Sequence, residues 1–498
     1  MADDFFAAAK SHSLQSLIDM RARETPDAVF FISPESGKIF SYGELARRAR
    51  AMGAALQTLP PGAPLGVMTG NGWAAAQALL GAPYHGRMAL IFNAAAGDSQ
   101  LAYMIQHSGC RLVYADAEHM ARAQNIIRQC EGARVVAVDR DAGFCGKECA
   151  PPKVAADSPA LLIYTSGTTG KPKGVLHSHR SLLYGGANTA AAHELTAADR
   201  ALCVLPLCHI NGQCVTIMAP LVSGGSVVAP HKFSAGNFWR QIKTHECTWF
   251  SAVPTILSHI LNGEDAPPLP HLRFGRSASS ALPPETLRRF EQKFSVPLVE
   301  TMGLTETAAQ ILSNPPPPQK GKTGSPGVAV GCEVRIMRGG GEAAAGEEGE
   351  IAVRGGNLML GYLHEKSAFT DGWFMTGDLG RMDADGYVFV TGRTKELIIK
   401  GGENIAPREI DDALYAAPGV VEAAAFGVPC EVYGQQVEAA AVAESFAQDE
   451  AKLLAACEKA VGKFKTPRRI HFLPSLPKGP SGKIQRLKLA ELCGARKE

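Results

Sequence analysis

The sequence predicts an α/β protein with a large N-terminal domain and a small α+β domain at its C-terminal end. Helical segments and short apolar, strand-like runs alternate through the first half of the chain, which is typical of layered α/β folds. Hairpin-like strands follow the glycine run at 339–341, and strands mix with a helix from Gly392 onward. At about 150 residues per domain, 498 residues correspond to roughly three domain-sized units.

The N-terminal part begins with two predicted helices. Leu14, Leu17 and Ile18 keep helical spacing, and Ser41 with Glu44 forms a capping box ahead of an apolar helical run. Short apolar runs then predict strands at 63–68, 111–114, 135–138, 226–229 and 249–253.

The pattern changes in the second half of the chain. Strands predicted at 350–354 and 387–391 have the spacing of antiparallel hairpins. A strand at 396–400, a helix at 407–415 and a strand at 422–426 then form the small domain. We place the boundary at 392–395, which gives domains of 1–394 and 395–498.

The balance of charges excludes functions that need a charged surface. Lys and Arg total 50 against 48 Asp and Glu, so a net charge of +2 offers no bulk attraction for nucleic acid or an anionic membrane. No apolar run approaches the ~20 residues of a membrane span. Asp3 and Asp4 stand where a secretory signal carries positive charge. We therefore expect a cytoplasmic protein.

The twelve cysteines are expected to be reduced and mostly buried thiols. Metal ligation is the less favoured alternative at Cys145 with Cys149. The cysteines that lie closest together in the sequence around a histidine are Cys203, Cys208 and Cys214 with His209. They lack the paired C-x-x-C spacing of a zinc site.

A loop dense in hydroxyls, glycines and lysines carries the clearest chemical signal. An apolar strand runs into it over 161–174, LLIYTSGTTGKPKG. Glycines let backbone N–H groups converge on an anion, hydroxyls add donors, and lysines supply charge. A Walker loop is excluded, because two residues rather than four separate Gly167 from Gly170-Lys171 and Pro172 replaces Ser or Thr. The segment predicts a different kind of phosphate loop, with a solvated surface loop as the alternative.

Further motifs follow in order at 206–209, 277–282, 303–306, 376–378, 392–396, 401–405 and 480–484. Together with 166–174 they resemble, over nearly the whole chain, the signature of the adenylate-forming superfamily, which includes acyl-CoA synthetases, peptide-synthetase adenylation domains and luciferases. The resemblance implies layered sheets plus a β-barrel-like part in the large domain. It also implies a mobile C-terminal domain that turns at the hinge residue Lys395.

The resemblance also implies roles for individual residues. Catalytic roles fall to Lys483, Thr165, Glu306 and His209. The implied ATP and AMP contacts are Thr165, Ser166, Gly167, Thr168, Thr169, Gly170, Lys171, Lys173, Ser279, Ser280, Ala281, Glu300, Thr301, Met302, Gly303, Thr305, Asp378, Arg393 and Lys483. The implied acyl pocket is His209, Ser251, Val253, Ser277, Met302 and Ala308. Formation of the thioester is assigned to Gly401, Gly402 and Glu403.

These roles suit the chemistry, because a carboxylate that attacks the ATP α-phosphate needs its charge neutralised. Glu306 is suited to hold Mg²⁺, Asp378 to accept the ribose hydroxyls, and Arg393 to add a forked donor. Lys483 offers a compact charge on a long stem. The structural alternatives are a turn former at Asp378, a solvated hinge charge at Arg393 and a tail lysine at Lys483.

Two positions have weaker assignments. His209 is either a core histidine or a gate between the acyl pocket and the thiol tunnel. Met302 stands where the family has an adenine-stacking tyrosine, although a flexible Met can still pack on a purine.

We interpret the chain as a carboxylic acid:CoA ligase that uses ATP, Mg²⁺ and coenzyme A. An amino acid substrate is disfavoured because 205–213 contains no acid to pair with its ammonium. No cation is placed for a second carboxylate, which favours a monocarboxylic acid, aliphatic or aromatic. The chain ends fifteen residues after Lys483, so no carrier domain is expected. The alternatives are a ligase that loads a separate carrier protein and a non-catalytic family member, and a homodimer is left open.

Overall fold

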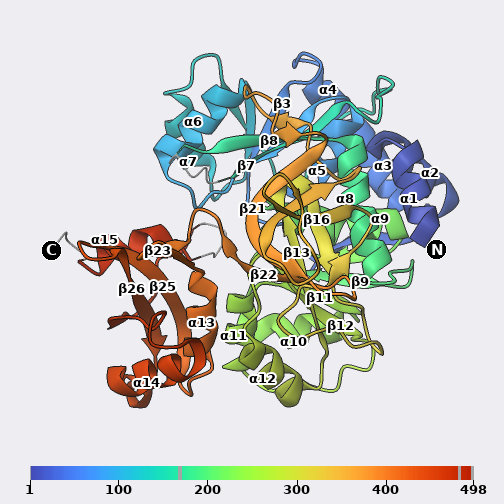
Figure 1. The fold of residues 1–498 in the computed structure, drawn as a ribbon. Helices are drawn as coiled ribbons and strands as arrows, with labels where there is room; N and C mark the ends of the chain where they lie inside the picture. The colour runs from blue at the N-terminus through green and yellow to red at the C-terminus, as the bar shows by residue number, and fades with distance from the viewer. Residues whose placement is uncertain (1, 166–170, 480–483, 495–498) are drawn as a thin grey trace.

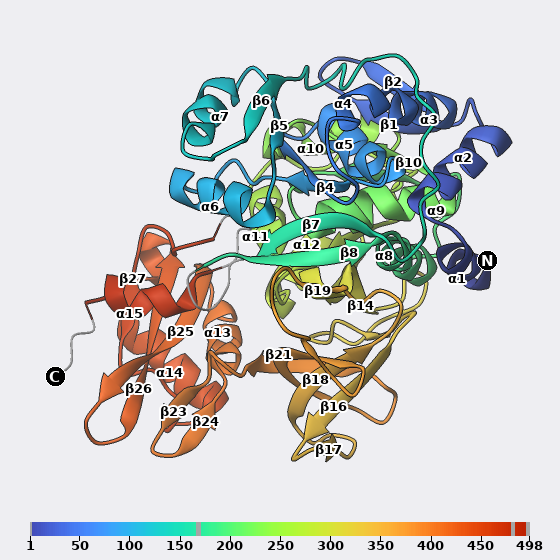
Figure 2. The same ribbon diagram turned by 90° about the horizontal axis from the view of Figure 1, so that it is seen from above.

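The computed structural model describes residues 2–165, 171–479 and 484–494, and in them the chain forms four β-sheets. Three sheets with their helices make the large N-terminal part, and the fourth belongs to a smaller C-terminal unit at its side (Figure 1). Figure 2 shows the same arrangement from above, with the hairpin of β7 and β8 crossing the large part.

The seven-stranded sheet has the strand order β19-β8-β7-β4-β3-β5-β6. Its inner strands are parallel and short, and β3 is buried at every position, as expected of a parallel sheet covered on both faces. The strands are β3 (Pro64–Met68), β4 (Met88–Ile91), β5 (Leu112–Ala115), β6 (Arg134–Ala137), β7 (Pro159–Thr165), β8 (Lys173–Ser178) and β19 (Gly361–Tyr362). The helices next to them in sequence are α4 (Gly53–Leu56), α5 (Trp73–Tyr84), α6 (Asp98–Ser108) and α7 (Met120–Ile127).

The nine-stranded sheet has the order β15-β14-β13-β12-β11-β9-β10-β1-β2. Its strands are β1 (Val29–Ser33), β2 (Lys38–Ser41), β9 (Arg200–Cys203), β10 (Ser226–Val228), β11 (Trp249–Ala252), β12 (Phe274–Ser277), β13 (Leu298–Leu304), β14 (Ala309–Ser313) and β15 (Val328–Ala329). Helical segments in this part are α1 (Ala2–Ser11), α2 (Leu14–Glu24), α3 (Tyr42–Ala51), α8 (His179–Ala192), the π-helix η1 (Asn211–Met218), α9 (Ala219–Ser223), α10 (Ala235–Thr244), α11 (Pro254–Leu261), α12 (Pro284–Phe294) and the 3₁₀ turn η2 (Thr305–Thr307).

The two faces of this sheet bury different cores. Along β11, Phe250 packs with residues of α10, α11 and α12, whereas Trp249 belongs to the core that includes α8 and η1. Because side chains alternate between faces along a strand, Ser251 lies on the same face as Trp249. That face, under α8 and η1, also carries Arg276, the register partner of Ser251.

An antiparallel six-stranded sheet follows, where the resemblance implies a barrel-like part. Its strands are β16 (Glu333–Arg338), β17 (Gly341–Glu342), β18 (Gly349–Arg354), β20 (Phe369–Thr370), β21 (Trp373–Met382) and β22 (Val388–Arg393).

The C-terminal unit is a five-stranded sheet with helices. Its strands are β23 (Ile398–Lys400), β24 (Glu403–Ile405), β25 (Val420–Cys430), β26 (Gly434–Ala443) and β27 (Ile470–Phe472). Its helical segments are α13 (Pro407–Tyr415), η3 (Ser445–Ala447), α14 (Glu450–Val461), η4 (Arg486–Lys488) and α15 (Leu489–Leu492). Arg408 of α13 donates to the carbonyl of Val390 at 2.8 Å and so links this unit to β22.

The capping box predicted at the start of α3 forms only in part. The Ser41 hydroxyl accepts from the Glu44 N–H at 3.2 Å. The Glu44 carboxylate, however, pairs with Arg47 at 2.5 Å and with Arg48 at 2.6 Å. Because Arg47 and Arg48 bind the Glu44 carboxylate, it does not accept the hydrogen bond from the Ser41 N–H that a full capping box requires.

No helix within the described part of the chain is both long and apolar enough to cross a membrane.

Candidate active site

The predicted phosphate loop joins two antiparallel strands. Thr165 ends β7 and pairs in register with Lys173, the first residue of β8. Ser166, Gly167, Thr168, Thr169 and Gly170 lie outside the described residues, and Lys171 is exposed.

Lys173 stands at the base of this loop and already has partners. Its ammonium pairs with Glu365 at 2.7 Å and lies 4.8 Å from the centre of the Tyr362 ring. These contacts hold β8 against the β19 segment. The charge of Lys173 is therefore already shared with protein groups.

Glu306 lies in the 3₁₀ turn η2, which is fixed from two sides. Its Oε1 accepts from the Tyr362 hydroxyl at 2.9 Å, and its carbonyl accepts from the Met359 N–H at 2.9 Å. Nε2 of His177 donates to the Thr305 carbonyl at 2.7 Å. Burial lowers the pKa of His177 to about 4, so the ring is neutral at pH 7 and donates as a fixed tautomer.

Asp378 and Arg393 form an ion pair across strands β21 and β22. They are register partners, with Arg393 Nε 2.6 Å from Asp378 Oδ1. The Asp378 side chain is 7% exposed and that of Arg393 is 47% exposed. Burial would lower the pKa of Arg393, but the carboxylates of Asp378, Glu396 and Glu306 together raise it. Asp378, predicted to bind ribose, and Glu306, predicted to bind Mg²⁺, therefore both raise the pKa of the Arg393 guanidinium.

The predicted adenine loop is anchored by a buried carboxyl group. Glu300 accepts from the Leu282 N–H at 3.0 Å. Burial raises the pKa of Glu300, against the Leu282 hydrogen bond and the charge of Arg408, which lower it. Ser279 has a φ of +72°, and the next two residues, Ser280 and Ala281, are exposed.

The rest of the nucleotide motif follows along β13. Thr301 is buried and donates to the Ser277 carbonyl at 3.2 Å. Met302 is half-buried, as is Thr305. At Gly303 a Cβ would lie 1.8 Å from the Ala309 carbonyl oxygen, so only glycine fits this crossing.

The predicted acyl-pocket residues are not all on one surface. Ser251 and Ser277 are both buried, but Ser251 is in register with Arg276 and Ser277 with Ala252. The strand period therefore places the two serines on opposite faces of the sheet. Ser277 Oγ has no hydrogen-bond partner among the residues that the structure describes.

The remaining predicted pocket residues differ in burial and belong to different elements. His209 is half-buried just ahead of the π-helix η1, and Val253 caps α11. Ala308 is fully buried, and a Cβ on Gly185 of α8 would lie 2.2 Å from its carbonyl oxygen.

A cation that sequence reasoning missed lies among these segments. Arg276 precedes Ser277 on β12, is 1% exposed, and donates to Ser251 at 3.0 Å and to Asn211 at 3.2 Å. A buried cation thus lies one residue before the predicted adenine loop and next to a serine predicted for the acyl pocket. The available signal was an arginine inside the otherwise uncharged strand Phe274–Ser277, directly before the adenine motif.

The residues predicted for the second half of the reaction lie in the C-terminal unit. Gly401 and Gly402, with φ of +58° and +86°, form the two-residue turn between β23 and β24, the conformation of a tight hairpin. Both are exposed, as is Glu403. Lys395 lies in the turn that joins β22 to β23, and Lys483 lies outside the described residues.

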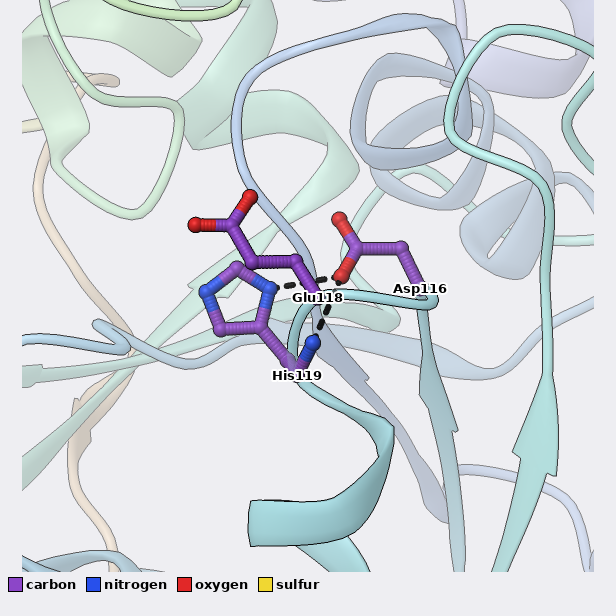
Figure 3. Close-up of side chains that lie close together, drawn as sticks. All are labelled: Asp116, Glu118 and His119. Carbon is purple, nitrogen blue, oxygen red and sulfur yellow. Dashed lines mark hydrogen bonds and ion pairs between the residues drawn. The ribbon is translucent and has the colours of Figure 1, made fainter.

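Three potential metal ligands come together elsewhere, at the end of β5 (Figure 3). The ligand atoms of Asp116, Glu118 and His119 lie within 4.8 Å of one another. Arg140, however, pairs with Asp116 at 2.5 Å and with Glu118 at 2.6 Å, and His119 Nδ1 lies 2.6 Å from Asp116. The arginine supplies the positive charge that a metal would bring, which makes this a structural ion-pair cluster.

The cysteines near His209 are free and poorly ionised. Burial raises the pKa of Cys203 to about 11 and that of Cys208 to about 12.

Comparison with known proteins identifies the family. A family model described as AMP-binding enzyme matches residues 18–363, and one described as AMP-binding enzyme C-terminal domain matches 409–483. The chain is 45% identical to sulfoacetate–CoA ligase of Cupriavidus necator over 496 residues, 96% of this chain and 97% of that protein. It is 37% identical to oxalate–CoA ligase of Arabidopsis thaliana over 423 residues, 80% and 82% of the two chains.

A solved structure extends the similarity to the fold. O-succinylbenzoate coenzyme A synthetase from Bacillus subtilis, in complex with ATP and magnesium ion, matches with a TM-score of 0.85 at 29% identity. The match covers 95% of this chain and 98% of that one. The chain therefore belongs to the AMP-binding enzyme family of the adenylate-forming superfamily and is an ATP-dependent, AMP-forming carboxylic acid:CoA ligase.

Proposed function

We propose that this ligase activates a short carboxylic acid that carries a second anionic group, and that one site performs both half-reactions. The observation that carries the ATP-dependent part of the proposal is the ion pair of Asp378 with Arg393, whose pKa the charge of Glu306 also raises. Their charges act on one another, and Tyr362 links Glu306 to the strand pair next to Lys173.

In the first half-reaction, a carboxylate oxygen of the acid attacks the α-phosphorus of ATP and pyrophosphate leaves. Asp378 accepts from the ribose hydroxyls, and Arg393, held by Asp378, directs its remaining donors at ribose or phosphate. The segment 165–171 and Lys483 are assigned the donors and the positive charge that the phosphates need. Glu300 holds the segment from Ser279 to Leu282 for the adenine.

Glu306 offers a carboxylate of the kind that Mg²⁺ takes as a ligand, and its turn is fixed by His177 and Met359. A Mg²⁺ ion bound there would reduce the negative charge on the ATP phosphates.

In the second half-reaction, the sulfur of coenzyme A attacks the acyl carbon. The bond from that carbon to the AMP oxygen breaks, AMP leaves, and the thiol proton passes to solvent. The exposed hairpin turn at Gly401 and Gly402, followed by Glu403, is assigned to this step. We place the domain boundary between residues 394 and 395. The segment 395–498 then turns as a unit about Lys395 between the two half-reactions.

The acid is inferred from two sources. Sulfoacetate and oxalate, the acids in the names of the two relatives, are short and carry a second anionic group. In this chain, the buried cation Arg276 lies next to Ser251. A panel of acetate, propionate, benzoate, malonate, oxalate and sulfoacetate, assayed for pyrophosphate with and without coenzyme A, tests the proposal.

We expect pyrophosphate and a CoA thioester with at least one of the three doubly anionic acids and weak turnover of the others. Preference for benzoate or propionate would contradict the assignment of the acid. Pyrophosphate release without a CoA thioester, from any acid, would instead support the loading of a carrier protein.

We place the enzyme in the cytoplasm. All twelve cysteines are free thiols, which suits a reducing compartment. Fractionation of the host cell with detection by antibody tests this placement, and recovery in an extracytoplasmic fraction would contradict it.

A further inference from the structure

Arg276 is a buried cation whose hydrogen-bond partners are all uncharged. Its Nη1 donates to Asn211 Oδ1 at 3.2 Å and to Ser251 Oγ at 3.0 Å. Its Nε and Nη2 donate to Gln310 Oε1 at 3.3 and 3.2 Å. Among the described residues, no carboxylate lies within ion-pair distance of this guanidinium.

No carboxylate of the described residues therefore balances the positive charge of the Arg276 guanidinium. Burial lowers the pKa of Arg276 to about 9, and no acidic group opposes this effect. The neighbouring His193 does not help, because burial and then the charges of Arg276 and Arg273 lower its pKa well below the usual value. A buried charge without a counter-ion costs free energy, which a bound anion would recover.

The position of Arg276 connects this charge to the site. Asn211, the first residue of the π-helix η1, accepts hydrogen bonds from both Arg276 and Ser251, the cross-strand neighbour of Arg276. Asn211 Nδ2 donates to Ser279 Oγ at 3.3 Å, in the loop that follows β12. Single-turn π-helical segments occur preferentially at functional sites.

The hydrogen bonds also set the direction of the Asn211 amide. Its Oδ1 accepts from both Arg276 and Ser251, the latter at 3.1 Å, so its NH₂ group is turned away from the arginine toward Ser279. The NH₂ group therefore lies on the side of Ser279, and the positive charge of Arg276 lies behind the amide oxygen. A donor with a positive charge behind it complements an anionic group of the acid. An apolar group in the same place would gain no hydrogen bond.

We propose that Arg276, acting through Asn211, makes this ligase selective for acids whose second group is anionic. The inference rests on the proposed function, in that it takes this site to bind the acid. Asn211 contacts the second anionic group, a sulfonate or a carboxylate. Arg276 is a positioning residue that orients the Asn211 amide and supplies the balancing charge.

The test compares pairs of acids that match in shape and differ in charge. Sulfoacetate is paired with methylsulfonylacetate, and oxalate with oxamate. For the wild-type enzyme we expect kcat/KM for CoA-dependent AMP formation to favour the charged member of at least one pair by roughly 10²-fold or more. The sulfonate and carboxylate pairs show which anion the site prefers.

In Arg276→Met this preference should collapse toward parity, mainly through a higher KM for the charged acid, while turnover of the neutral acid persists. Arg276→Lys should restore part of the preference, because it retains the charge. Equal losses for the charged and the neutral acid would show a merely structural role and overturn the proposal.

A second variant keeps the test decisive if Arg276→Met does not fold. Asn211→Asp leaves Arg276 in place, supplies it with a counter-ion and removes the facing donor, so it should reject the charged acid selectively. An unchanged preference in this variant would overturn the role of Asn211.

The two proposals fail in different ways. If wild-type enzyme forms no CoA thioester from any doubly anionic acid, the proposed function fails. If it forms thioesters from both members of each pair equally well, only the role of Arg276 and Asn211 fails.

Discussion

His177 shows how one buried side chain supports the turn that carries Glu306. Its ring bonds the Thr305 carbonyl at 2.7 Å through Nε2 and the Ser181 hydroxyl at 3.0 Å through Nδ1, and the side chain is fully buried. The folded pKa is about 4, against 6.5 for a free histidine. Between these values the unfolded chain binds more protons than the folded one, so stability falls as the pH falls from 6.5 to 4.

We predict that His177→Gln removes this part of the pH dependence while its amide still donates to Thr305. At 1.36 kcal/mol per pH unit, the wild type should lose about 2 kcal/mol more unfolding free energy than the variant between pH 6.5 and 5. Urea unfolding at the two pH values measures the difference. His179 and His193 are common to both proteins, so their effects cancel, and identical losses would show that His177 does not stay neutral in the fold.

A second prediction at the residue scale concerns Lys483. Because its charge is assigned to the meeting of carboxylate and α-phosphate, Lys483→Ala should lose roughly 10²-fold or more in acyl-adenylate formation. Thioester formation from supplied acyl-adenylate should largely survive. Lys488→Ala, at an exposed position in the same segment, is the control. If both half-reactions fell equally in Lys483→Ala, the lysine would be structural.

Residues differ in how far the sequence reveals their place. Motifs single out Asp378 and Arg393, the structure adds their ion pair at 2.6 Å, and their roles toward ATP stay predictions. The roles of Arg276 and His177 could not be predicted. Each depends on contacts with strands and turns far away in the chain, and neither stands in a motif that the sequence analysis used.

At the scale of elements, a buried ion network ties the turn at 394–396 to Arg486 of η4. Arg486 Nη2 lies 2.6 Å from Asp411 of α13, and its Nε lies 3.3 Å from Glu396. Burial raises the pKa of Asp411, which Arg486 opposes. Asp411 also accepts from the Ala425 N–H of β25 at 2.6 Å. The network thus joins a turn, a helix and a strand of the C-terminal unit.

We predict that Arg486→Met destabilises this unit by about 3 kcal/mol, because it leaves the Asp411 carboxylate buried without its cation. Hydrogen exchange over α13 and β25 measures the loss. The double variant Arg486→Met, Asp411→Asn should recover part of it, since the amide oxygen still accepts from Ala425 and no charge remains. Equal exchange in the wild type and the single variant would contradict the role of the network.

Most elements could be predicted where local pattern and tertiary packing agree. The helix predicted at 407–415 is α13 with the same bounds, because Pro407 begins it and apolar residues recur on one face. The strand predicted at 396–400 is shorter, Ile398–Lys400, because residues 394–396 form the turn out of β22. The strand predicted at 422–426 extends to Val420–Cys430, since its pairing with β26 continues beyond the apolar run.

At the scale of the whole molecule, the two proposed half-reactions require the C-terminal unit to turn between them. Lys483 and the turn at Gly401 are both assigned to one nucleotide site, yet some eighty residues separate them in the chain. The connection runs through the turn at Lys395, between β22 of one sheet and β23 of another. Hinges absorb a large backbone change in a few residues.

We predict that Lys395→Pro traps the unit in one orientation, because proline fixes φ near −65° and restricts the residue before it. Pyrophosphate release should persist while thioester formation collapses. Lys395→Ala, which leaves φ and ψ unrestricted, is the matched control and should lose far less. Unimpaired turnover in the proline variant would contradict the hinge, and an equal loss in the alanine variant would show that the side chain matters instead.

Activation of the acid as an acyl-adenylate transfers one of its carboxylate oxygens to AMP, so the fate of that oxygen can be followed with an isotope label. The acid, labelled with ¹⁸O in its reacting carboxylate, is incubated with ATP, Mg²⁺ and coenzyme A, and the products are analysed by mass spectrometry. Attack on the α-phosphorus followed by displacement with the thiol leaves one carboxylate oxygen on AMP. We predict one ¹⁸O in AMP and none in pyrophosphate. Formation of ADP with the label in inorganic phosphate, or AMP without label, would contradict the account.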